Sequence, residues 1–121
     1  MLNVKKWMMK VLGYLTTNTA TPTFNSGFSG TIHSTTQVRK SGDLVTAYMR
    51  LQPITIAAGN NQSVVNIPSG FRPASVVYGT AYYNDNDAKA CSINSSGNVA
   101  LNISSAITNG YIICYFTYRV G

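Results

Sequence analysis

Apolar and polar residues alternate along much of this chain, and the alternation is clearest over residues 43–54. The positions that would share one face of a strand there are all apolar: Val45, Ala47, Met49 and Leu51. The positions between them are mixed: Leu44, Thr46, Tyr48 and Arg50. Because successive side chains of a strand point to opposite faces, this pattern predicts a strand with one buried face.

Similar patterns predict further strands, with turn residues between them. These strand-like segments are 31–39, 64–67, 74–83, 90–94, 98–103 and 111–120. The last of them is apolar on both faces, so we expect it to be central or covered on both sides. Seven or so short strands with regular turns predict a mainly β protein, an antiparallel β-sandwich of jelly-roll-like form over residues 31–121.

The segment Ile67–Pro73 contains two prolines with Gly70 between them. Proline lacks an amide donor and fixes its own φ, and it also restricts the residue before it to extended conformations. Gly70 can take positive φ at little steric cost. We therefore expect a rigid, extended crossing between two strands, which Phe71 attaches to the core.

Residues 1–16 are expected to form a short N-terminal α-helix. Its apolar residues recur at spacings of three and four, and two more flank them: Val4, Met8, Val11 and Leu15, with Trp7 and Leu12. So short a helix needs a partner surface. Trimerisation and packing on a larger assembly both fit the pattern, and a cleaved signal peptide is the rival interpretation. Residues 17–30, rich in Thr, Asn, Ser and Gly, are expected to be an extended linker.

Charge is scarce, at 10% of the 121 residues, and the net charge is +6. The basic residues are scattered and form no stripe, so we expect no nucleic-acid partner. No apolar stretch is long enough to cross a membrane. Residues 90–118 carry no charge, although edge strands are usually protected by charges, which suggests that other subunits cover this surface.

The residues with catalytic or metal-binding chemistry do not form a recognisable motif. Cys91 and Cys114 lack metal-ligand spacing, and two buried thiols are favoured over a disulfide. Asp43 lies in a predicted turn and His33 has no acidic neighbour. With no phosphate-binding glycine loop and no nucleophile elbow, we expect neither an enzyme nor a cofactor or metal site.

A candidate ligand-binding loop follows the strand at 74–83. It runs through Tyr82, Tyr83, Asn84, Asp85, Asn86 and Asp87. Tyr rings can stack on a sugar face while neighbouring Asn and Asp side chains bond its hydroxyls. The simpler alternative is that one Tyr packs in the core and the other is exposed, beside a polar loop.

Residues 43–120 resemble the C-terminal domains of tailed-bacteriophage appendage proteins, namely tail-fibre, baseplate receptor-binding and head-fibre proteins. The likeness lies in a strand, a Pro/Gly crossing, a hairpin and a Tyr-rich final strand, and its motif residues are Pro68, Gly70, Phe71, Arg72, Pro73, Gly97, Val99 and Tyr118. The resemblance implies a homotrimeric β-sandwich whose outer end contacts host-surface glycans. Typical appendages have a long N-terminal shaft, whereas here only a predicted helix and linker precede the β-domain, so we expect a short fibre or spike.

Together these observations predict a bacteriophage virion structural protein, assembled in the host cytoplasm. It would be a short head or tail fibre or spike, whose N-terminal helix trimerises it or contacts other virion proteins. Its β-domain would project outward and could bind a host-surface glycan. The alternatives are a capsid decoration or cementing protein without a receptor role, a secreted carbohydrate-binding module, and a hydrolase that joins Asp85, Asp87 and His33 in one cleft.

Overall fold

One antiparallel sheet contains every strand in the computed structural model, which describes residues 17–84 and 88–120. The strands are β1 (Thr17–Ala20), β2 (Thr23–Phe24), β3 (Gly30–Ile32), β4 (Gln37–Ser41), β5 (Leu44–Ile56), β6 (Gly59–Asn66), β7 (Val77–Tyr83), β8 (Ala88–Ile93), β9 (Asn98–Ile103) and β10 (Ile107–Arg119). Their order is β1-β4-β5-β10-β7-β8-β9-β6-β2, and β3 also pairs with β5. The predicted mainly antiparallel β fold is confirmed, whereas the N-terminal helix and the residues assigned to it lie outside the described residues.

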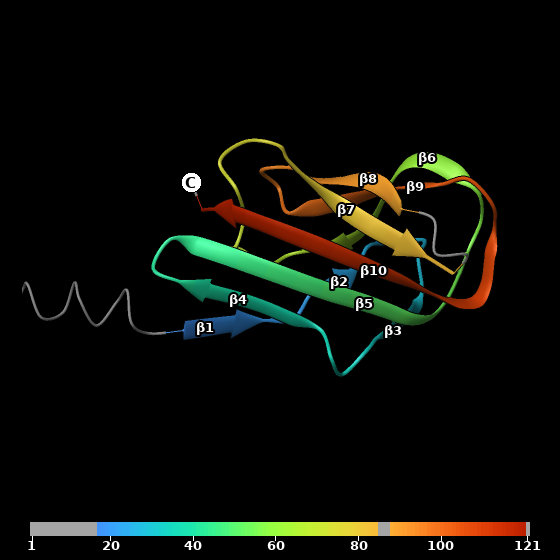
Figure 1. Ribbon diagram of the computed structural model, residues 1–121, viewed down its shortest axis with the longest axis horizontal. Helices are drawn as coiled ribbons and strands as arrows, with labels where there is room; N and C mark the ends of the chain where they lie inside the picture. The colour runs from blue at the N-terminus through green and yellow to red at the C-terminus, as the bar shows by residue number, and fades with distance from the viewer. Residues whose placement is uncertain (1–16, 85–87, 121) are drawn as a thin grey trace, which may run out of the picture.

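The sheet curls so that its two halves enclose a single core (Figure 1). In that view β5, β10 and β7 lie in front, and β9, β6 and β2 lie behind them. Phe24 of β2 and Ile54 of β5 both lie against Gly30, so strands distant in the sheet order come together across the core. The predicted division into two separate sheets is not observed, because hydrogen bonding continues from β10 through β7 into β8.

The alternation of β5 gives the core one of its walls, as the sequence predicts. Val45, Met49 and Leu51 are fully buried and Ala47 is nearly so, whereas Tyr48 is only partly buried. A register irregularity between β6 and β9 turns the consecutive residues Val64 and Val65 both into the core. The sheet therefore has an apolar inner face and an outer face that is free for other roles.

The apolar strand β10 is central, between β5 and β7, as predicted. β8 and β9 also have a hydrogen-bonded neighbour on each side, whereas the ends of the sheet order are β1 and β2. The charge-free segment 90–118 therefore supplies interior strands, which need no charged residues to protect an edge. The absence of charge there gives no reason to invoke covering subunits, and the homotrimer remains a prediction.

The segment 17–30, expected to be an extended linker, contributes strands to the sheet. β1 pairs with β4, and β2 pairs with β6. Phe24 and Phe28 pack partly buried against the core. The predicted strand 31–39 is divided into β3 and β4 by a turn, in which the Thr36 amide donates to the His33 carbonyl at 2.9 Å.

The crossing from Ile67 to Pro73 contains a turn and is not extended throughout. The Phe71 amide donates to the Pro68 carbonyl at 3.2 Å, and Gly70 has φ +93°, the positive value that its type allows. The expectation of a fully extended segment is wrong because this local hydrogen bond reverses the chain. Phe71 packs against the core, as predicted.

The glycine at position 79 makes room for an aromatic ring on the inner face. Gly79 pairs with Cys91 of β8, and a Cβ on it would lie 2.3 Å from the Tyr115 carbonyl oxygen and 2.6 Å from Cδ1 of Phe116. The ring of Phe116 therefore fills the space that a side chain at position 79 would occupy. This close packing joins β7 to β10 beneath the outer face.

Cys91 and Cys114 are free and buried, so the predicted pair of buried thiols is confirmed. The hydrogen bond between them, followed by burial, raises the pKa of the Cys114 thiol well above its ordinary value. The Cys114 thiol therefore stays protonated at neutral pH and is an unreactive core side chain. Among the described residues no helix is long and apolar enough to span a membrane.

Candidate functional site

Three tyrosines from three adjacent strands form a row on the outer face of the sheet. Tyr48 of β5 pairs directly with Tyr115 of β10, and their ring centroids are 5.3 Å apart at an interplanar angle of 57°. Tyr82 of β7 meets Tyr115 edge to face, at 5.9 Å and 84°. Tilted and edge-to-face contacts are the geometries that aromatic pairs prefer. We call Tyr48, Tyr115 and Tyr82 the tyrosine row.

The row is open to solvent although its rings contact one another. Tyr115 is 47% exposed and Tyr82 is 40% exposed. The neighbours of Tyr115 along β10, Cys114 and Phe116, point inward and are buried. Packing of the core holds these strands rigidly, and contacts between side chains on neighbouring strands hold the three rings. The row therefore presents its ring faces and hydroxyls in a defined arrangement.

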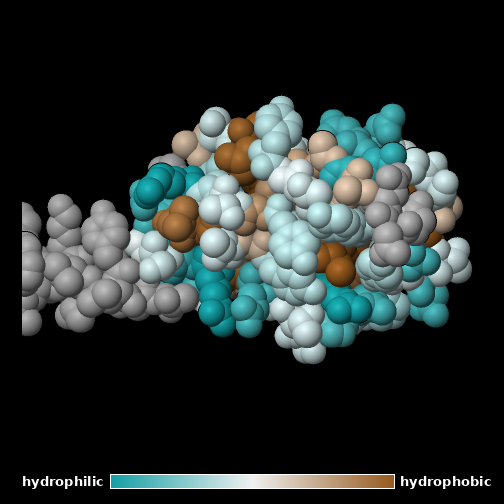
Figure 2. Space-filling model, viewed as in Figure 1, coloured by the Kyte–Doolittle hydropathy of each residue, from teal (hydrophilic) through white to brown (hydrophobic). Residues whose placement is uncertain are grey.

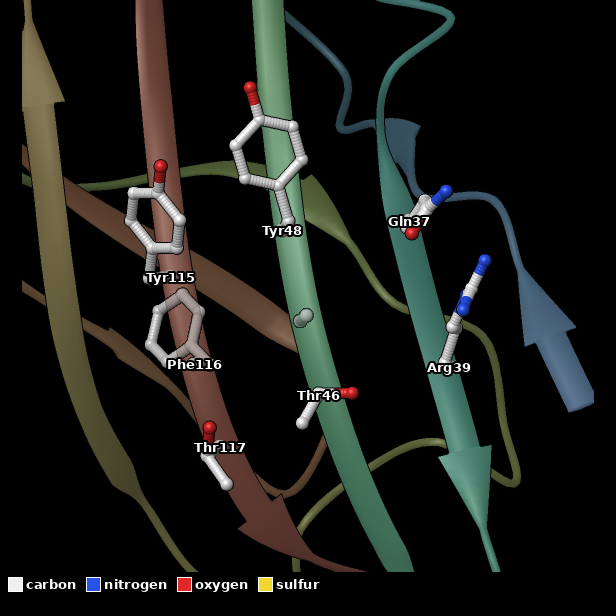
Figure 3. A pocket seen from close by; sticks show the side chains of 8 residues that line it. Gln37, Arg39, Thr46, Tyr48, Tyr115, Phe116 and Thr117 are labelled. Atoms are coloured by element: carbon white, nitrogen blue, oxygen red, sulfur yellow. The ribbon is translucent and has the colours of Figure 1, made fainter. Parts of the chain in front are cut away.

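A shallow hollow lies beside the row, and Figure 3 shows its lining. Tyr48 and Tyr115 stand next to each other at one end, and the short side chains of Thr46 and Thr117 leave the space below them open (Figure 3). Gln37 and Arg39 of β4 border the other side. The hollow thus combines aromatic faces, hydroxyls, an amide and one guanidinium.

The surrounding surface is polar, as Figure 2 shows for the same side of the molecule. Weakly polar side chains cover the middle of this face, and strongly hydrophobic ones appear only in separate spots. A large continuous apolar patch would indicate an apolar partner. This mixed surface suits a ligand with both apolar faces and hydroxyl groups.

The residues of the predicted ligand-binding loop do not form one site in the structure. Tyr82 points outward into the tyrosine row, but Tyr83 is 5% exposed and belongs to the core. Asn84 is exposed at the end of β7. Residues 85–87, which carry the loop's two carboxylates, lie outside the described residues. The two neighbouring tyrosines do not share a face because they are consecutive in a strand.

The other candidate residues have local partners. Asp43 accepts a hydrogen bond from Arg119 at 2.6 Å, in an exposed ion pair. Nδ1 of His33 lies 2.8 Å from the Thr35 hydroxyl within the turn between β3 and β4. Within residues 17–84 and 88–120 no group of three or more His, Cys, Asp or Glu side chains is placed to hold a metal ion.

A second hollow lies farther across the outer face, over β8, β9 and β6. Tyr78, which is 78% exposed, borders it together with amide and hydroxyl side chains that include Asn94, Asn98 and Asn102. Asn102 is held by β8 and β6, because it donates to the Ala90 carbonyl at 3.2 Å and accepts from the Asn61 amide at 2.8 Å. This hollow contains no charged side chain.

The motif residues of the crossing serve the fold and not the row. Arg72 Nε donates to the Ile67 carbonyl at 2.8 Å, and its Nη2 donates to Asn66 Oδ1 at 3.0 Å. Gly97 lies against Arg72, because a Cβ on it would be 2.5 Å from Arg72 Nε. Lys40 Nζ donates to the Gly70 carbonyl at 2.8 Å. The Ile67 amide also donates to the Gly97 carbonyl at 2.8 Å, so the crossing is attached to the Asn94–Asn98 hairpin on one side and to β4 through Lys40 on the other.

Comparison of the chain with models of known protein families and with curated proteins finds no match. The site must therefore be interpreted from its own chemistry. Sequence reasoning found Tyr82 but not Tyr48 or Tyr115 as site residues. The alternation already turned Tyr48 outward, and only the pairing of β5 with β10 brings it beside Tyr115.

Proposed function

We propose that this protein is a bacteriophage virion structural protein, a short head or tail fibre whose β-domain binds host-surface saccharides through the tyrosine row. The observation that carries the binding part is the row itself, three mutually supporting rings on a rigid strand framework. The virion part derives from the resemblance in sequence over residues 43–120. The proposed protein binds saccharides and catalyses no reaction on them.

The physical chemistry of the row favours a saccharide over a lipid or an apolar peptide. A pyranose has apolar C–H faces and polar hydroxyl edges, which match the ring faces and polar tips of tyrosines. Thr46, Thr117 and Gln37 add hydroxyl and amide groups that can donate and accept hydrogen bonds. Because the strands are packed from beneath, little conformational freedom is lost on binding.

The test is binding of the full chain to an array of immobilised bacterial-surface polysaccharides. We expect saturable binding to a subset of them, weakened about three- to tenfold by Tyr115→Ala, because a stacked ring contributes on the order of 1 kcal/mol. Tyr48→Ala should act in the same direction. Tyr78→Ala is the matched control, since it removes an exposed tyrosine that borders the other hollow.

Two results would contradict the proposal in different ways. Equal losses in Tyr115→Ala and Tyr78→Ala would mean that the row is not the binding element. Saturable binding to phage particles without affinity for any polysaccharide or host cell would instead identify a capsid decoration protein. Thermal unfolding of each variant checks that the fold is retained.

A further inference from the structure

We propose that the hollow beside Tyr48 and Tyr115 selects saccharides that carry a carboxylate, with Arg39 as the residue that binds the carboxylate. This inference rests on the proposed saccharide binding by the tyrosine row, and it adds the chemical class of the ligand. The carboxylate would belong to the sugar itself, as in a uronic or sialic acid.

The first reason is the shortage of protein carboxylates around the site. The chain has nine basic and three acidic residues, and Asp43 is the one acidic side chain within residues 17–84 and 88–120. Asp43 already pairs with Arg119 at 2.6 Å. The described part of the chain therefore offers Arg39 no carboxylate partner, and an acidic ligand would meet no competing anion from these residues.

The second reason is that neighbouring cations are engaged and Arg39 is not. Arg72 donates to Ile67 and Asn66, and Lys40 donates to the Gly70 carbonyl and lies 5.0 Å from the centre of the Phe71 ring. Among the described residues the exposed guanidinium of Arg39 makes no hydrogen bond or ion pair. All of its donors can therefore face a ligand, including the paired donors that fit a carboxylate.

The third reason is position. Arg39 pairs with Thr46, which pairs with Thr117, whereas Gln37 pairs with Tyr48, which pairs with Tyr115. Arg39 thus lies about 6.6 Å from Tyr48 along the strands and one strand to its side, whereas Tyr115 is two strands away. Figure 3 shows Arg39 on β4, across the hollow from the tyrosines. Thr46 and Thr117 leave the space between open, so an oligosaccharide stacked on Tyr48 can extend a second sugar, with its carboxylate, toward Arg39.

The charge pattern favours a single carboxylate over a nucleic acid. Arg50, two residues beyond Tyr48 on β5, is a second cation near the row, and its Nε already donates to Gln52 Oε1 at 2.6 Å. A polynucleotide requires a track of cations along its phosphates. One open guanidinium among Thr and Gln side chains instead matches one negative charge on a ligand that is otherwise neutral.

The experiment titrates the full chain with short oligomers of galacturonic, glucuronic and N-acetylneuraminic acids, each beside its methyl ester. The ester keeps the ring and removes the charge. We expect at least one acid to bind about tenfold more tightly than its ester, because charged hydrogen bonds are stronger than neutral ones. Arg39→Gln should abolish that preference, so that acid and ester bind with similar affinity, and Arg39→Lys should restore part of it.

Arg119→Gln is the control, because it removes the same charge from an exposed arginine that lies four residues beyond Tyr115 on β10. It should change acid binding by less than about twofold, since exposed charges at that distance are screened by salt. Equal losses in Arg39→Gln and Arg119→Gln would overturn the assignment, because they would show general charge attraction.

The remaining outcomes separate this inference from the proposed function. If acid and ester bind equally and Tyr115→Ala weakens both, saccharide binding stands and the carboxylate preference is wrong. If no acid or ester binds, both are wrong. A single-stranded oligonucleotide that binds more tightly than every acid would overturn the inference in favour of a nucleic-acid site.

Discussion

The hydroxyl of Tyr118 donates a hydrogen bond to the main-chain carbonyl of Phe71, 47 residues earlier in the chain. Tyr118 is in the central strand β10, and Phe71 is in the crossing between β6 and β7. The bond therefore attaches the crossing to the middle of the sheet. The isolated pairing of Pro73 with Val120 lies immediately beside it.

Removal of this hydroxyl should destabilise the fold without harming the site. Tyr118→Phe keeps the buried ring and leaves the Phe71 carbonyl without its partner, so we expect a loss of about 1 kcal/mol in the free energy of unfolding. Denaturant unfolding measures it. Saccharide binding should be unchanged, because Tyr118 is buried on the inner face; a variant as stable as the wild type would show that the bond contributes nothing.

The same tyrosine predicts how stability changes in alkali. Burial raises the pKa of Tyr118 from 10.0 to about 12. Above pH 10 the unfolded chain loses this proton while the folded chain keeps it, so Tyr118 contributes its full stability below pH 10 and loses it as the pH rises through about 12.

Comparison of the wild type with Tyr118→Phe isolates this effect, because both proteins share every other titrating group. The stability difference between them should be constant up to about pH 10 and then shrink, by the linkage of proton binding to folding. Urea titrations at several pH values measure it. A difference that is independent of pH up to about 12 would contradict the raised pKa.

Close packing on the inner face predicts that substitution of Gly79 strongly destabilises the fold. Gly79→Ala would place a Cβ 2.3 Å from the Tyr115 carbonyl oxygen, and backbone on two paired strands would have to move. We expect a loss of at least about 2–3 kcal/mol. Gly27→Ala is the control: its Cβ would meet nothing within 4 Å, and it has only the strain of a positive φ of +90°, about 1 kcal/mol. Similar losses in both would mean that the contact with β10 is unimportant.

Solution mass tests the predicted trimer. We expect the full chain to have three times the mass of one 13.0 kDa chain. Because the charge-free strands β8, β9 and β10 are interior, we expect the chain without residues 1–16 to be monomeric, with the apolar seam of the predicted helix as the element that associates. A monomeric full chain would refute the trimer, and a trimeric truncated chain would assign association to the β-domain.

Local patterns in the sequence were sufficient to predict the strands, but not to predict which strands pair with each other. The alternation of Val45 to Leu51 and the apolar character of 111–120 correctly gave a buried face and a central strand. The continuous sheet, in place of two, depends on the pairing of β10 with β7, which no local pattern encodes. The turn at Pro68–Phe71 was missed because the prolines were taken to act alone, without the local hydrogen bond.

The candidate site was predictable only in part for the same reason. Tyr48, Tyr82 and Tyr115 are far apart in sequence, and the order β5-β10-β7 with its register makes them neighbours. The alternation of β5 indicated that Tyr48 faces outward, but not that the three tyrosines meet. Arg39 drew no attention as one of several scattered basic residues, since its lack of a partner is a property of the folded chain.

The alternation of β5 also sets what kinds of change the site can accept. Tyr48 stands between Ala47 and Met49, which are both in the core. Replacement of Tyr48 therefore alters the outer face without touching the core. Insertion or deletion of one residue before it in β5 would turn the tyrosine inward and core residues outward. The outer surface of this sheet can thus vary in chemistry, but not in the length of the strands that carry it.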